Sequence, residues 1–130
     1  MAHLLTDCTN LLKTAWDEVK VQRSTNAKNK IKCLISDIGH NLGEDYEDAP
    51  EYIALTNILE QKISPYNSFF GWISCQQYYK SMLLLLNSDY ISCDVLDIGN
   101  AETYFRQAIP LYCRLSGETP PTLKSINPAG

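Results

Sequence analysis

Apolar side chains recur every three or four residues along most of this 130-residue chain. Between Leu4 and Val19 the apolar positions fall in an arc of roughly 140° on a helical wheel, whereas Asp7 and Lys13 lie outside it. This spacing is typical of amphipathic α-helices and predicts a helix over residues 3–22. We therefore expect an all-α fold in which each helix turns an apolar face toward a shared core.

The same spacing predicts three of the remaining helices. One covers residues 27–41, and another begins at Pro50, whose fixed φ suits a first helical turn, and stops before Pro65. The last follows Asn100, which we expect to cap it. The chain is thus expected to form one compact bundle of four to five helices over residues 1–117, with an extended or mobile tail over residues 118–130. The predicted buried face of the second helix is Ala27, Ile31, Leu34, Ile35, Ile38 and Leu42.

A fourth helix, predicted over about residues 69–87, is apolar nearly all round its axis. Its polar residues form only a narrow strip, made of Gln76, Gln77, Lys80 and Ser81. Helices of this kind are usually enclosed by others, so we expect the fourth helix to be central, with Leu83 or Leu84 in the core.

Hydropathy and cysteine content indicate where in the cell the protein is located. The longest apolar run, residues 82–86, is far shorter than the ~20 residues of a membrane-spanning helix, and the first residues do not resemble a signal peptide. The five cysteines include no Cys-x-x-Cys pair of the kind that holds zinc. We therefore expect free thiols, a cytoplasmic location and no membrane contact.

Groupings that could support catalysis are few. Cys33, Asp37 and His40 share one stripe of the second predicted helix, but Cys33 and His40 lie about 10 Å apart along the axis, beyond hydrogen-bond reach. No glycine-rich phosphate loop or metalloprotease motif occurs. We expect no catalytic, cofactor or metal site. An enzyme with a cryptic site at His40 or Cys93 is the third alternative.

Charge is unevenly distributed along the chain. Residues 13–32 contain six basic and two acidic residues, whereas residues 37–60 contain seven acidic residues and no lysine or arginine. The basic stretch lacks interleaved aromatic residues, and the isoelectric point is about 5.0. Direct binding of nucleic acid is therefore not expected.

Five carboxylates lie within residues 44–51, here called the acidic segment. One interpretation is a solvated loop whose charges favour the N-terminus of the next helix. The other is a docking surface for a basic partner, with tyrosines as contact residues. This second interpretation predicts the partner-binding residues Glu44, Asp45, Tyr46, Glu47, Asp48, Glu51 and Tyr52.

These patterns favour a non-enzymatic protein-binding module. The narrower hypothesis is a small acidic inhibitor, of the toxin-immunity or anti-defence type, that covers a basic surface of another protein. The alternative is a helical adaptor or chaperone-like subunit that binds through an apolar groove around Phe69, Phe70 and Trp72. The sequence does not indicate an oligomeric state.

Overall fold

A computed structural model describes residues 2–61, 71–89 and 94–123, and the predicted all-α fold is confirmed within these ranges. No helix in the described ranges is both long and apolar enough to cross a membrane. The helices are α1 (Ala2–Glu18), α2 (Thr25–His40), α3 (Pro50–Gln61), α4 (Trp72–Leu86) and α5 (Ala101–Ser116), joined by strands β1 (Lys20–Val21) and β2 (Leu96–Asp97) and the 3-10 turn η1 (Tyr46–Asp48).

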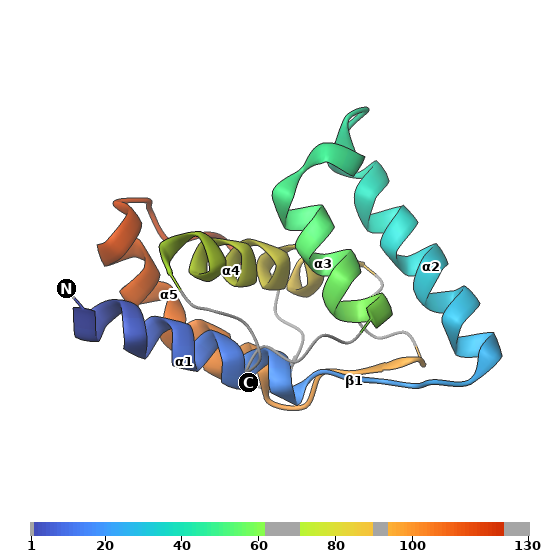
Figure 1. Cartoon of the computed structure of the whole chain (residues 1–130), viewed down its shortest axis with the longest axis horizontal. Coiled ribbons are helices and arrows are strands. Elements are labelled where there is room, and N and C mark those ends of the chain that lie inside the picture. Colours follow the sequence, from blue (N-terminus) through green and yellow to red (C-terminus); the bar gives the residue numbers. More distant parts are fainter. Residues whose placement is uncertain (1, 62–70, 90–93, 124–130) are drawn as a thin grey trace.

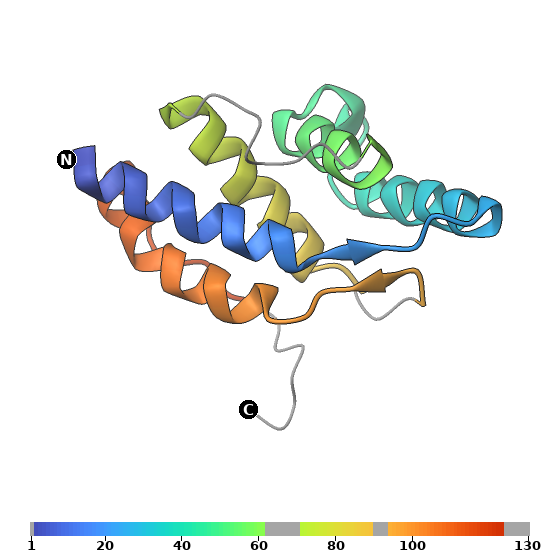
Figure 2. The same ribbon diagram turned by 60° about the horizontal axis from the view of Figure 1, so that its bottom comes forward.

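The first and last helices lie side by side and run in opposite directions (Figures 1 and 2). The chain leaves α1 through β1 and enters α5 through β2, and the two strands pair antiparallel, with Lys20 opposite Asp97. Helices α2 and α3 form a hairpin at the other end of the molecule, with η1 in the connection between them (Figure 1). Helices α1 and α5 thus pack against each other, and the strands that follow α1 and precede α5 extend this contact.

Helix α4 contacts α1, α3 and α5, as expected for a central helix. Its rotation differs from the prediction, because Leu85 and Leu86 are fully buried while Leu83 and Leu84 are only half-buried. Ser81, predicted to face water, is also buried and donates a hydrogen bond to the carbonyl oxygen of Tyr78 at 3.2 Å. Because this helix is apolar nearly all round its axis, its pattern did not specify which apolar side is buried most deeply.

Three predicted helix boundaries are wrong by two or more residues. Helix α2 begins at Thr25 instead of residue 27, because the side chain of Ser24 caps it by accepting a hydrogen bond from Ala27 N. Helix α1 ends at Glu18 instead of residue 22, because the chain becomes extended to pair with β2. Helix α4 begins at Trp72 instead of residue 69, because the backbone of Gly71 is extended. Asn100 precedes α5, but its side chain makes no capping hydrogen bond; its backbone N–H donates to Glu18 Oε1 at 3.0 Å.

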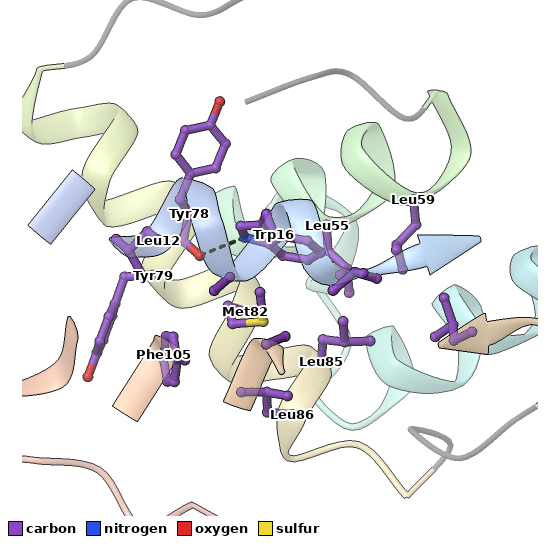
Figure 3. Packing of buried hydrophobic residues seen from close by; sticks show 14 of the residues in the cluster. Leu12, Trp16, Leu55, Leu59, Tyr78, Tyr79, Met82, Leu85, Leu86 and Phe105 are labelled. Atoms are coloured by element: carbon purple, nitrogen blue, oxygen red, sulfur yellow. Dashed lines mark hydrogen bonds between the residues drawn. The ribbon is translucent and has the colours of Figure 1, made fainter. Parts of the chain in front are cut away.

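The core joins α1, α4 and α5 by specific contacts as well as by apolar burial. Trp16 Nε1 donates a hydrogen bond to the carbonyl oxygen of Tyr78 at 3.1 Å, which links α1 to α4 (Figure 3). The rings of Tyr79 and Tyr112 stack with centroids 3.6 Å apart, and Phe105 stacks on Tyr79 at 5.1 Å. Burial raises the pKa of both tyrosine hydroxyls, so they stay neutral in the core.

The predicted burial of α2 is confirmed with one exception. Ala27, Ile31, Leu34, Ile35 and Ile38 are buried. Leu42, just beyond the end of this helix, is 39% exposed and therefore does not join the core. Of the predicted tail, residues 118–123 form no helix or strand, and residues 124–130 lie outside the described ranges.

Candidate functional site

The acidic segment forms the connection between α2 and α3. Hydrogen bonds from Asp48 N to the carbonyl oxygen of Asp45, and from Ala49 N to that of Tyr46, close the turn η1, both at 3.1 Å. Helix α3 then begins at Pro50, as predicted from its sequence. The four carboxylates of Glu44, Asp45, Glu47 and Asp48 are exposed, and Glu51 in the first turn of α3 is half-buried.

Tyr46 and Tyr52 hold this connection against the last turn of α2. Their rings meet edge to face with centroids 5.0 Å apart, and the centroid of the His40 ring lies 5.1 Å from that of Tyr46. Both rings cover Gly39, where an added Cβ would lie only 2.7 Å from Tyr46 Cε2 and from Tyr52 Cε1. Tyr46 and Tyr52, which were predicted as partner contacts, are thus half-buried, and their rings hold the acidic segment in position.

Gly39 was not recognised as part of this site from the sequence. Glycine lowers the stability of a helix interior, so a glycine there often indicates that another chain segment approaches too closely to leave room for a side chain. This was the signal that the sequence offered. Here two aromatic rings make that approach. Burial raises the pKa of the Tyr52 hydroxyl, and neighbouring Tyr46 and Glu47 raise it further, so this group stays neutral and can donate a hydrogen bond.

The charge of the acidic segment is not neutralised within the described part of the chain. None of its carboxylates forms an ion pair there with a lysine, arginine or histidine. Five carboxylates so close together repel one another, and a cationic surface would relieve that repulsion. The segment is therefore a fixed, exposed and strongly negative surface.

Basic side chains gather around the opposite end of α2. Lys30 Nζ lies 2.8 Å from Asp94 Oδ2, and this hydrogen bond lowers the pKa of Asp94. Arg23, Lys28 and Lys32 line a cleft of about 480 Å³ together with apolar side chains of α2 and α3. Helix α2 thus has a basic surface near its beginning and an acidic surface at its end.

The residues considered for catalysis are not enclosed. Cys33, Asp37 and His40 are all exposed on α2, and His40 Nδ1 donates a hydrogen bond to the carbonyl oxygen of Ser36 at 2.7 Å. In residues 2–61, 71–89 and 94–123, no group of three or more histidine, cysteine, aspartate or glutamate side chains is placed to hold a metal ion. Cys93 lies outside these ranges.

The apolar groove considered as an alternative is only partly within the described structure. Phe69 and Phe70 lie outside it. The ring of Trp72 stacks on Tyr112 with centroids 5.3 Å apart and an interplanar angle of 23°. This indole is therefore already engaged by the core.

Comparison with known proteins finds no match for the chain among protein families, curated proteins or solved structures.

The cysteines predict a sharp difference in thiol reactivity. Cys8 and Cys75 are fully buried with sulfur atoms 3.8 Å apart, and the hydrogen bond between them together with burial raises the pKa of Cys8. Cys33 is exposed. In the native protein a thiol reagent should modify Cys33 rapidly and leave Cys8 and Cys75 protected, because only an accessible thiolate reacts.

Mass spectrometry of peptides after brief labelling would measure this difference, with urea-unfolded protein as the control in which all five cysteines react. Rapid labelling of Cys8 under native conditions would contradict the packing of α1 against α4.

Proposed function

We propose that this protein is a non-enzymatic binding module whose acidic segment covers a basic surface of a partner protein. The observation that carries the proposal is the set of four exposed carboxylates on a connection pinned by Tyr46, Tyr52 and Gly39. A surface that is already fixed loses little conformational entropy on binding, and its concentrated charge speeds encounter with a cationic partner.

Within this class, we propose an inhibitor of the toxin-immunity or anti-defence type. Proteins that act on nucleic acid present basic surfaces, because phosphate contacts supply much of their affinity. A small acidic domain is complementary to such a surface and blocks it without chemistry of its own. The narrower proposal rests on this complementarity of charge.

The test is reversal of Asp45, Glu47 and Asp48 to lysine in one variant. The partner is first isolated from the native host with the unaltered protein as bait. Its affinity is then measured with both proteins at low and moderate salt. The reversed variant should bind at least about tenfold more weakly, which corresponds to about 1.4 kcal/mol, and its binding should depend less on salt.

A matched control reverses three exposed carboxylates elsewhere, those of Asp7, Glu60 and Glu118. It makes the same change in net charge but leaves the acidic segment intact, so it should retain most of the affinity. Circular dichroism establishes that both variants remain folded. Equal losses in the two variants, or no loss in either, would contradict the proposed role of the acidic segment.

A further inference from the structure

Three leucines near the end of α2 and on α4 are not fully buried, although the sequence placed Leu42 and one of Leu83 and Leu84 in the core. Leu42 is 39% exposed, and Leu83 and Leu84 are half-buried. All three line one cleft of about 490 Å³ between the end of α2, the start of α3 and the second half of α4. Exposed apolar surface that is gathered in one concavity is typical of a binding site.

This cleft is continuous with the acidic segment. Leu42 lies two residues before Glu44, the first carboxylate of the segment, and Glu51, the last one, itself lines the cleft. The exposed carboxylates therefore occupy the connection between two walls of the cleft. The basic side chain in the lining is Lys80, so the cleft and its rim together carry five carboxylates against one lysine.

We propose that this cleft receives an aliphatic side chain from a basic polypeptide segment of the partner, while lysines or arginines flanking that side chain meet the acidic segment. The inference rests on the proposed function and adds the apolar centre of the interface. Interfaces commonly combine such a desolvated centre with a polar rim, and the centre contributes most of the binding energy.

Charge complementarity selects this occupant. A purely apolar ligand would leave the five carboxylates of the cleft and its rim without a partner, and an anionic ligand would be repelled by them. A highly charged segment without an apolar side chain would satisfy the rim but leave Leu42, Leu83 and Leu84 exposed to water. A basic segment with one aliphatic side chain satisfies both parts.

Two synthetic peptides of equal charge test the inference. The first places leucines between pairs of lysines, and the second has serine in place of each leucine. Affinity is measured by calorimetry, and contacts are located by amide chemical shifts in the ¹⁵N-labelled protein. The leucine peptide should bind about tenfold more tightly and shift the signals of Leu42, Leu83 and Leu84, whereas the serine peptide should shift only those of the acidic segment.

Variants of the cleft complete the test. Leu42→Ser and, separately, Leu84→Ser should remove the preference for the leucine peptide. Because Leu42 is 39% exposed, its replacement should leave the fold intact. Ile73→Ser is the matched control, because Ile73 is 70% exposed on α4 but does not line the cleft. This control should keep the preference.

The outcomes separate this inference from the proposed function. Equal binding of both peptides through the acidic segment would overturn the apolar centre and leave the proposed function standing. Failure of both peptides to shift the acidic segment would contradict the proposed function itself. Self-association in sedimentation experiments that Leu84→Ser abolishes would overturn the inference by showing that a second copy of the chain occupies the cleft.

Discussion

Replacing Leu85 by alanine should lower the free energy of unfolding by about 2–5 kcal/mol, the cost of a cavity in a core that does not collapse to fill it. Leu85 is 0% exposed and lies on the central helix α4, within the cluster formed with α1, α3 and α5 (Figure 3). Equilibrium denaturation in urea, monitored by far-ultraviolet circular dichroism, would measure the change.

Two further alanine substitutions calibrate the result. Leu84→Ala should cost less than Leu85→Ala because Leu84 is half-buried, and Ile73→Ala should change stability by no more than about 0.5 kcal/mol because Ile73 is 70% exposed. The order of the three effects reports the rotation of α4 about its axis. A larger loss at Leu84 than at Leu85 would show that the assigned rotation is wrong.

Replacing Gly39 by alanine should destabilise the protein by about 1–3 kcal/mol, even though alanine favours helices over glycine by about 1 kcal/mol. The added methyl group would overlap the rings of Tyr46 and Tyr52, so the connection that carries the acidic segment must move. Thermal denaturation would measure the stability. Chemical shifts of the His40 ring, which lies 5.1 Å from Tyr46, would report the displacement.

A double-mutant cycle isolates this contact. In a Tyr46→Ala background one of the two obstructing rings is absent, so Gly39→Ala should cost clearly less than in the unaltered protein. If Gly39→Ala stabilises the protein in both backgrounds, helix propensity outweighs the steric overlap. The packing of the Tyr46 and Tyr52 rings then does not require glycine at residue 39.

The amphipathic helices could be predicted from the sequence because the spacing of apolar residues is a local pattern. A repeat of 3.6 residues determines which side chains share a face, so Ala27, Ile31, Leu34, Ile35 and Ile38 could be assigned to the core before any neighbouring helix was known. The start of α3 was equally local, since Pro50 has a fixed φ and needs no amide partner in the first turn. The exposure of the carboxylates in the acidic segment follows from the cost of burying unpaired charge.

The acidic segment could therefore be recognised in the sequence, but the contacts that hold it in place could not. Gly39 and the two tyrosines come together only when the chain reverses direction between α2 and α3. The cleft beside the acidic segment was even harder to predict from the sequence, because its lining comes from three helices and includes leucines that the pattern placed toward the core. Whether these residues contact a partner stays a prediction for both surfaces.

Tertiary structure alone decided the remaining features, and distance along the chain explains why. Helix α1 ends early because Lys20 and Val21 pair with residues more than 70 positions later, a competition that no local propensity records. Helix α4 is apolar nearly all round its axis, so contact with α1, α3 and α5 had to select the side that buries Leu85 and leaves Leu84 near water. Local periodicity determines the faces a helix has, whereas packing among distant segments determines which face is covered.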